Sequence, residues 1–471
     1  MPPFSFVLLG VLGFLAYKNR KNYKLIVRDF FLVTLLVSFL MNYGYFVQVG
    51  SFELAYDEFC TGVLFALCLP YFFKGKYDNS MMKLCIVFLV SCALGFLSSA
   101  AHPFVPSGFL TTDQSWDSYV FGYTMLTHNV VGSLKMLMIP LRFFLFFFVL
   151  SVLKENFVKE DWTCCLNVVL YVSKFMLLFG CIEFFLKNVF EFNFGDNIYN
   201  HIFGKGVSTF SSLTKRGDLY VLQGLFRETG RFAAYLFWLG FTWIIPIKKN
   251  PKRIDNYVWP AINLLLLPFT GSFAGIMYLA LLAAFYVLYY CSRHKKAFIA
   301  LVAVGVGVLL FGGALIVLKP DIVAYYWGRV QGVLDSITLI ITGQSQVIQS
   351  SEYIRILSIV KLAQIWIDRF FFGIGFGVTW GHSALFWILA CGGIVGLAIW
   401  GYFIFKKFIP DYKISICVLL VLVSTSLTQN LSIFYSFPYA LVLFTVHGGH
   451  EKAAAPLLGG TKYFCTSALD K

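Results

Sequence analysis

Charged residues are scarce in this sequence, and the scarcity decides the broad class of the protein. Asp, Glu, Lys and Arg together make up 13% of the 471 residues, whereas roughly a quarter of the residues in a water-soluble domain are charged. Hydrophobic residues make up 59%, the mean hydropathy is +0.77, and Phe alone occurs 53 times. So few charges do not cover the surface of a soluble domain, and the sequence therefore predicts an integral membrane protein.

Acidic residues are the rarer of the two charged classes. The sequence has 23 Asp and Glu against 37 Lys and Arg, which gives a net charge of +14. The basic residues lie in short clusters between apolar runs rather than along one face, which excludes a nucleic-acid partner. Most of the 11 cysteines fall inside apolar runs without metal-ligand spacing, and this excludes a disulfide framework. The motif G-x-x-x-x-G-K-[ST] is absent, which excludes an ATP-driven pump within this chain.

The apolar runs predict an all-α polytopic protein with a single transmembrane domain over residues 1–447. A spanning helix needs about 20 apolar residues, and the runs give about 12–14 such helices. The thirteen predicted spans are 2–17, 29–48, 59–73, 84–101, 136–153, 163–188, 231–247, 257–270, 272–291, 297–318, 383–405, 414–428 and 431–447. Turns at Pro268–Gly271 and at Thr428–Asn430 divide two long uncharged stretches.

Basic clusters occur at every second connection, and short loops rich in Lys and Arg stay in the cytoplasm. The clusters are Lys18/Arg20/Lys21/Lys24, Lys74/Lys76/Lys83, Lys154/Lys159, Lys248/Lys249/Lys252/Arg253, Arg293/Lys295/Lys296 and Lys406/Lys407/Lys413. The connection 49–58 is acidic and has no basic residue. This alternation predicts that three long loops, 102–135, 189–230 and 319–382, face outwards. Residues 448–471 are then a cytoplasmic tail or a segment foreign to the protein.

The second long loop ends in a charged cluster where it enters a predicted helix. Arg227, Glu228 and Arg231 lie within five residues of each other, and Arg216 precedes them. Arginines at a helix end often anchor it at the membrane interface. A cluster that also contains a Glu is less typical of an anchor. The alternative is a binding site for an anionic substrate, and both interpretations stay open.

The third long loop contains Arg329 and then a segment, 350–369, with a helical polar stripe. Its polar residues recur every three or four positions, at Arg355, Ser358, Lys361, Gln364 and Asp368. Such a helix can lie in the interface as a structural element. It can equally form a lid whose Arg and Lys face a pyrophosphate, because the planar guanidinium binds phosphate oxygens through two hydrogen bonds.

A glycine-rich segment, 372–382, ends in His382 at the start of the eleventh predicted span. A single histidine in such a place is as often structural as functional. In the functional interpretation, His382 orients or deprotonates a sugar hydroxyl.

Three ionisable residues fall inside the predicted spans. Arg142 and Glu183 lie at similar depth near the outer ends of their helices, and an ion pair between them would offset part of the cost of burial. Lys174 lies near the bilayer centre and has no predicted partner. It is the one feature that favours a transporter.

Three stretches together resemble the O-antigen polymerase and O-antigen ligase superfamily. They are Gly-Leu-Phe-Arg-Glu-Thr-Gly-Arg-Phe-Ala-Ala-Tyr-Leu at 224–236, Leu-Pro-Phe-Thr-Gly-Ser-Phe-Ala-Gly at 267–275, and the glycine-rich stretch 373–397 with His382. The sequence departs from the family pattern at Thr229, Phe273 and Ser383, where the family has Pro, Arg and Asn. The Phe-Arg-Glu segment favours a polymerase over a ligase.

The resemblance implies a membrane glycosyltransferase, with a GT-C-like architecture, on the periplasmic face of the bacterial inner membrane. The donor and the acceptor would both be glycans on undecaprenyl pyrophosphate, and a chain-length regulator protein is a possible partner. His382 and Glu228 would be catalytic. The residues that would bind pyrophosphate or glycan are Arg216, Arg227, Arg231, Arg329, Arg355 and Lys361. No D-x-D motif is present, so we expect no metal and no cofactor. The alternatives are an O-antigen ligase acting on lipid A-core and a lipid-linked oligosaccharide flippase.

Overall fold

The computed structural model describes residues 1–38, 45–49, 52–101, 134–204, 215–216, 219–226, 229–243, 253–291, 320–342, 351–376 and 383–402. Helices account for 81% of these residues, and the strands among them form two short hairpins. The predicted mainly helical class is therefore confirmed for the described part of the chain. The predicted spans 297–318, 414–428 and 431–447, and the segment 448–471, lie outside it.

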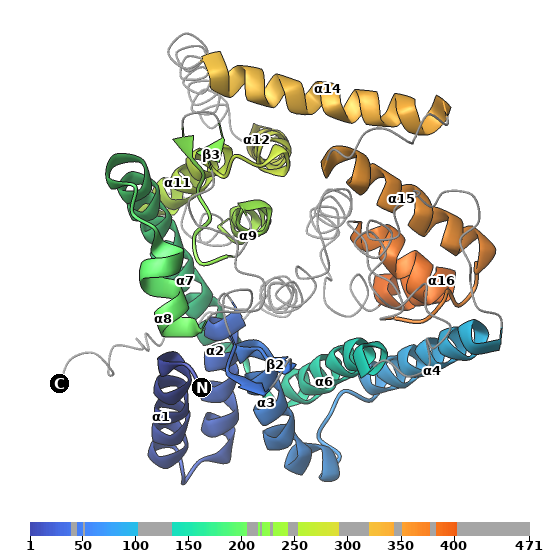
Figure 1. The fold of residues 1–471 in the computed structure, drawn as a ribbon. Helices are drawn as coiled ribbons and strands as arrows, with labels where there is room; N and C mark the ends of the chain where they lie inside the picture. The colour runs from blue at the N-terminus through green and yellow to red at the C-terminus, as the bar shows by residue number, and fades with distance from the viewer. Residues whose placement is uncertain are drawn as a thin grey trace.

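The N-terminal helices pack into one bundle (Figure 1). They are α1 (Pro3–Lys18), α2 (Tyr23–Ser38), α3 (Tyr56–Phe73), α4 (Asn79–Ala101), α6 (Leu134–Asn156) and α7 (Lys159–Phe190). Helix α2 packs on α3 and α7, while α6 packs on α3 and α4. The α2 boundaries correct the predicted span 29–48. The helix extends into the charged residues from Tyr23 because Lys24, Arg28 and Asp29 all have ionic partners, and residues 47–49 form a strand instead.

Short elements lie at the start of α1, at the start of α3 and at the end of α7, which form the end of the bundle without basic clusters. Strands β1 (Val47–Val49) and β2 (Phe52–Leu54) form an antiparallel hairpin before α3. After α7 come the π-helical turn η2 (Gly195–Tyr199) and helix α8 (Asn200–Phe203). The Ser5 hydroxyl donates to the Phe46 carbonyl at 2.7 Å, and the Tyr45 amide donates to the Phe203 carbonyl at 3.2 Å. These bonds join the start of α1, the segment before β1 and helix α8 at one end of the bundle.

The second part of the chain begins with the hairpin β3 (Lys215–Arg216) and β4 (Leu219–Tyr220). It continues with the helices α9 (Thr229–Thr242), α11 (Asp255–Phe269), α12 (Phe273–Cys291), α14 (Pro320–Thr342), α15 (Ser351–Asp368) and α16 (Ala384–Tyr402). The predicted turn at Pro268–Gly271 is confirmed, since α11 ends at Phe269 and Gly271 has φ +61°. The predicted helix in 350–369 is confirmed as α15. The third predicted loop, 319–382, therefore contains two helices, α14 and α15.

Among the described residues, three helical segments are long and apolar enough to cross a membrane. They are Asn79–Ser98 in α4, Glu160–Phe190 in α7 and Leu385–Tyr402 in α16. Two shorter apolar stretches, Pro3–Lys18 and Ala274–Ala283, accompany them. The described part of the chain thus has the composition and helix length of a membrane-embedded protein.

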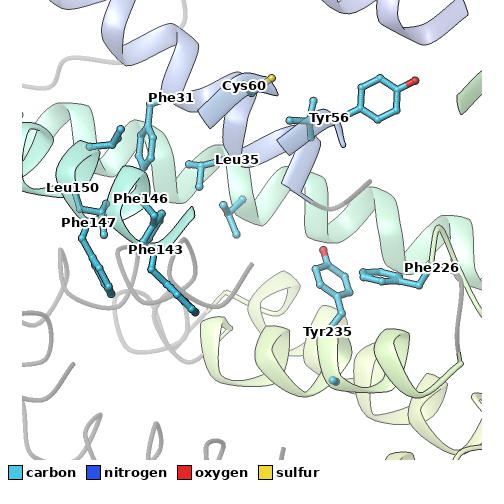
Figure 2. Packing of buried hydrophobic residues seen from close by; sticks show 14 of the residues in the cluster. Phe31, Leu35, Tyr56, Cys60, Phe143, Phe146, Phe147, Leu150, Phe226 and Tyr235 are labelled. Atoms are coloured by element: carbon cyan, nitrogen blue, oxygen red, sulfur yellow. The ribbon is translucent and has the colours of Figure 1, made fainter. Parts of the chain in front are cut away.

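Aromatic rings fill much of the interior. Along α6, Phe143, Phe146, Phe147 and Leu150 form a buried row, and Phe226 lies beside Tyr235 with ring centroids 5.2 Å apart (Figure 2). The Phe143 ring also meets Trp400 of α16 edge-on, at 5.0 Å. The high Phe content therefore supplies packing between helices, as well as exposed apolar surface.

Helix α16 is broken in its middle. Gly393 has φ +62° and ψ −167°, which no helical residue adopts. The segment 370–376 lies against the break: the amides of Ile374 and Gly375 donate to the carbonyls of Ala390 and Cys391, both at 2.9 Å. In return, the amides of Ile394 and Val395 donate to the carbonyls of Phe370 and Phe371, at 2.9 and 3.2 Å. An irregular segment thus replaces the helix's own hydrogen bonds within an apolar span.

Candidate functional site

The C-terminal end of α7 presents polar side chains to the segment that precedes Arg227. Glu183 and Lys187 are four residues apart, so they share one face of the helix, and Glu191 caps the helix in a left-handed conformation directly after its last residue. Glu183 and Lys187 form an ion pair, and both side chains are fully buried. A buried ion pair is stable only when further hydrogen bonds satisfy its remaining groups. The segment 219–226 provides them for the Glu183 carboxylate.

Gly224 meets the buried pair. Its amide donates to Glu183 Oε2 at 2.5 Å, and the backbone of Gln223 also hydrogen-bonds to this carboxylate. Gly224 has φ +57°, and a Cβ at this position would lie 2.7 Å from Cε2 of Phe232. A glycine is therefore required here, both for the backbone conformation and for the close approach of the ring.

Tyr220 is held by the next turns of α7. Asn188 forms two bonds with its backbone, accepting from the Tyr220 amide at 2.9 Å and donating to the Tyr220 carbonyl at 3.1 Å. The Tyr220 hydroxyl donates to Glu191 at 3.0 Å. Lys215 lies 3.5 Å from the same carboxylate and 4.4 Å from the Tyr220 ring. Hydrogen bonding with Tyr220 and the charge of Glu191 raise the pKa of Lys215.

The opposite side of the segment packs against α9 and the end of α11. The Leu222 amide donates to the Phe269 carbonyl at 2.8 Å. The Phe226 ring packs on Phe232 and Tyr235 of α9, with centroids 5.6 and 5.2 Å apart. Every residue from 221 to 226 is buried. The backbone directly before Arg227 and Glu228 is therefore fixed on two sides. We call residues 219–226 with Glu183, Lys187 and Asn188 the α7 clamp.

The structure brings together two of the three motifs that carry the resemblance. The segment 267–275 supplies the Phe269 carbonyl that binds Leu222, and Phe269 packs on Phe184 with centroids 4.6 Å apart. A Cβ on Gly275 would lie 3.6 Å from the Cβ of Ala233 in α9. Residues 224–236 and 267–275, which are separated in the sequence by a whole helix, are thus neighbours in space.

The third motif lies elsewhere. Helices α15 and α16 are set apart from α9, α11 and α12 in Figure 1, and α16 packs on α4 and α15. Phe376 meets Trp387 edge-on, at 5.0 Å. Ser383 caps α16, because its hydroxyl accepts from the Phe386 amide at 3.3 Å. The Arg369 guanidinium donates to the Ser98 hydroxyl of α4 at 3.4 Å.

The predicted site residues fall into two groups, and three of them, Arg227, Glu228 and His382, lie outside the described residues. Arg216 is in β3 and Arg231 in the first turn of α9, on either side of the α7 clamp in the chain. Arg329 is in α14, which packs on α15. Arg355 and Lys361 are both in α15.

The polar stripe of α15 does not form one exposed face. Arg355 is exposed, but Ser358 and Lys361 are each 1% exposed, while Ile367 on the same helix is 67% exposed. The middle of the stripe faces the protein because α15 packs between α14 and α16. The three-to-four-residue spacing predicts that these polar residues share one face of α15, but it does not show whether that face is buried.

The predicted ion pair between Arg142 and Glu183 is wrong. Arg142 pairs with Glu58 of α3 and Glu183 pairs with Lys187. Glu58 is held in place by the Ala55 amide, which donates to it at 3.1 Å. The four-residue spacing of Glu183 and Lys187 was a signal that could have identified the true pair. Sequence reasoning missed Lys187 and Asn188 altogether.

Lys174 is engaged by aromatic rings. Its ammonium lies 5.7 Å from the Tyr171 ring and 5.4 Å from the Trp259 ring of α11. Both contacts are within the range of cation–π attraction. The charge predicted to have no partner therefore has a structural role.

The arrangement offers a fixed backbone that directly precedes Arg227 in the chain, with Arg216 and Arg231 on either side of it in the sequence. In the part of the chain that the structure describes, no three His, Cys, Asp or Glu side chains gather as metal ligands. Metal independence stays a prediction. No protein-family model matches the sequence, and no curated protein matches it significantly.

Proposed function

We propose that this protein polymerises lipid-linked oligosaccharide repeat units into O-antigen or a related surface polysaccharide. The active face would be the periplasmic side of a bacterial inner membrane. The observation that carries the proposal is the α7 clamp. It fixes the backbone at the entrance to the segment Arg227–Arg231, beside the second segment of the resemblance, 267–275.

The proposed reaction needs positive charge more than it needs a strong nucleophile. The acceptor hydroxyl attacks the anomeric carbon of the donor glycan, the new glycosidic bond forms, and the bond to the lipid pyrophosphate breaks. The pyrophosphate leaves with the electron pair, and His382 or Glu228 accepts the hydroxyl proton. Arginines stabilise the charge that develops on the leaving group, and they do so best when their positions are fixed beforehand.

The clamp is suited to fixing these positions. Glu183 holds Gly224 only three residues before Arg227, and α9 begins with Arg231 in its first turn. Arginine side chains that project from a restrained backbone lose less conformational freedom when they bind a pyrophosphate. We therefore assign the leaving pyrophosphate to Arg227 and Arg231, with Arg216 nearby in the chain.

Two separate cationic groups favour a polymerase over a ligase. A polymerase binds a donor and an acceptor that each carry a lipid pyrophosphate, whereas a ligase binds one such substrate. The second group, Arg329, Arg355 and Lys361, lies on two helices that pack together. Lys361 is buried, so we assign the acceptor to the exposed Arg355 and to Arg329 of the neighbouring helix. Lys174, the one feature that favours a flippase, contacts two aromatic rings, which gives its charge a structural role.

Deletion of the gene tests the proposal through the length of the surface glycan on gels. We expect long ladders to disappear while single-unit glycan remains attached, and the wild-type gene to restore the ladder. Loss of all attached glycan, with lipid-linked polymer accumulating, would indicate a ligase. Loss of all glycan without such a polymer would indicate a flippase.

A further inference from the structure

Three short connections between helices, each with a basic cluster, lie together at the end of the bundle opposite the α7 clamp. They connect α1 to α2, α3 to α4, and α6 to α7. Lys24 of α2 pairs with Asp161 of α7 at 2.9 Å, and Lys154 of α6 pairs with Asp78 at 2.8 Å. The Asn156 side chain donates to the Lys76 carbonyl at 2.9 Å. The turns are therefore joined by side chains as well as by helix packing.

Part of this layer is electrically balanced. Three basic and three acidic side chains form ion pairs here: Lys24, Arg28 and Lys154 with Asp29, Asp78 and Asp161. Burial would raise the pKa of Asp78, but its hydrogen bonds with Lys154, Ser80 and Met81 outweigh burial and lower the pKa to about 2. The exposed acids Glu155 and Glu160 also belong to the α6–α7 turn. Little net charge remains on this side.

The other part of the layer carries unbalanced positive charge. Five exposed basic side chains lie in the α1–α2 and α3–α4 turns themselves, and none of them forms an ion pair with another described residue. They are Lys18, Arg20, Lys21, Lys74 and Lys76, which we call the basic rim. Tyr23 joins the two turns that carry them, since its hydroxyl donates to the Leu67 carbonyl at 2.7 Å and its ring lies 5.7 Å from Tyr71.

Exposed aromatic side chains show where the basic rim lies relative to a bilayer. Tyr17 is 66% exposed and Phe73 is 79% exposed, each directly before a rim residue. The Arg20 guanidinium lies 4.8 Å from the Tyr17 ring. Tyrosine is enriched at the level of the lipid head groups, whereas Phe73, and Phe6 and Phe14 of α1, belong to the exposed apolar surface. Tyr17 therefore indicates that the rim is at head-group depth, at the end of that apolar surface.

We propose that the basic rim binds the head groups of anionic phospholipids in the surrounding leaflet. Five exposed cations at head-group depth attract phosphate groups that carry net negative charge more strongly than zwitterionic ones. The carboxylates beside them, Asp29 and Asp78, are already engaged by Arg28 and Lys154. The neighbouring ion pairs keep the turns in place without competing for the lipid. This surface is at the opposite end of the bundle from the α7 clamp, so it is independent of the proposed glycosyl transfer.

Lipid titration of the full-length purified protein tests the proposal. Fluorescent phosphatidylglycerol or phosphatidylcholine would be added in mixed micelles to wild type and to a variant with Lys18→Gln, Arg20→Gln, Lys21→Gln, Lys74→Gln and Lys76→Gln. We expect wild type to prefer phosphatidylglycerol, and the variant to lose at least about tenfold of that preference. A charge-keeping control, with Lys→Arg at four positions and Arg20→Lys, should retain it. High salt should weaken it.

Three outcomes would overturn the proposal. The first is equal binding of the two lipids by wild type, and the second is an unchanged preference in the Gln variant. The third is displacement of phosphatidylglycerol by millimolar inorganic phosphate, which would indicate a soluble phosphate ligand instead. If the five-site variant fails to fold, the variants with Gln at 18, 20 and 21 or at 74 and 76 each provide the same test, with a smaller expected loss.

Discussion

Two irregular segments pack against the helices, and they are stabilised in different ways. The segment 219–226 depends on side chains of α7, above all on the Glu183 carboxylate that binds Gly224. The segment 370–376 depends on backbone bonds exchanged with the broken helix α16. A bilayer offers no hydrogen bonds, so either solution must satisfy the backbone internally. One region can therefore be altered by changing a single carboxylate, while the other can be altered mainly through its glycines.

The largest effect should follow from Gly393→Ala. Gly393 has φ +62°, and a Cβ there would overlap the Phe371 carbonyl group. Both the backbone conformation and the exchange of bonds with residues 370–375 would be lost, at a cost of about 3 kcal/mol or more. We expect little folded protein on size-exclusion chromatography in detergent.

Gly396→Ala is the matched control, because its Cβ would make only an ordinary contact, 3.8 Å from the Phe376 ring. This variant should elute and melt like wild type. A normally folded Gly393→Ala protein would show that the break in α16 is not what orders the segment 370–376.

Glu183→Ala should have the next largest effect. It leaves Lys187 charged, buried and without its carboxylate, and breaking a buried pair in this way costs about 3–5 kcal/mol. It also removes the acceptor for Gly224, so polymerisation should fall together with the melting temperature. The double variant Glu183→Gln, Lys187→Met should recover much of the stability, because no unpaired charge remains. If Glu183→Ala melts like wild type, the α7 clamp does not hold the segment.

Arg227 and Arg355 compare the two regions in function. If each binds pyrophosphate through two parallel hydrogen bonds, Arg→Lys should fail nearly as badly as Arg→Ala. We expect a loss of about 10²–10³-fold in polymerisation rate for Arg227→Ala, as for removal of one preorganised donor. Full activity of the Lys variants would indicate that these arginines are membrane anchors.

His382→Ala should lower the polymerisation rate about 10²–10⁴-fold if His382 is the base. Wild-type chain length in both Arg355→Ala and His382→Ala would show that α15 and the residues around His382 are not part of the site.

The smallest effect concerns acid stability. The folded pKa of Asp78 is lowered to about 2 from an ordinary value of about 3.8, so the folded state favours the ionised form. Its stabilising contribution is present above about pH 4 and is lost as the pH falls towards 2. The site is partly open to solvent, which screens the contribution to about 1 kcal/mol. Melting temperature measured from pH 6 to pH 3 should fall less steeply in Asp78→Asn than in wild type.

Much of the helical framework could be predicted from the sequence. The apolar runs around α4, α7 and α12 are long enough to be unambiguous, and Pro268 and Gly271 mark the turn between α11 and α12. The three-to-four-residue spacing in 350–369 correctly predicts α15. Local pattern was sufficient wherever one segment determined its own structure.

The details of the candidate site depend on contacts between distant segments, and these were less predictable. Both residues 370–375 and the residues around Gly393 are glycine-rich. Nothing in the sequence shows that these two segments hydrogen-bond to each other. Arg142 was paired wrongly because its true partner, Glu58, precedes it by more than eighty positions. The depth of a charged residue in the membrane limits which residues can form an ion pair with it, but does not identify the one that does.

The most direct test is polymerisation by the purified protein in liposomes. The substrate would be a short glycan repeat unit on undecaprenyl pyrophosphate, with a metal chelator present, and the product would be resolved by length on a gel. The account predicts a ladder of products from wild type and none from Arg227→Ala. Wild-type protein that binds the substrate but forms no product longer than one unit would contradict it, and a ladder that appears only with added magnesium or manganese would contradict the metal-independent mechanism.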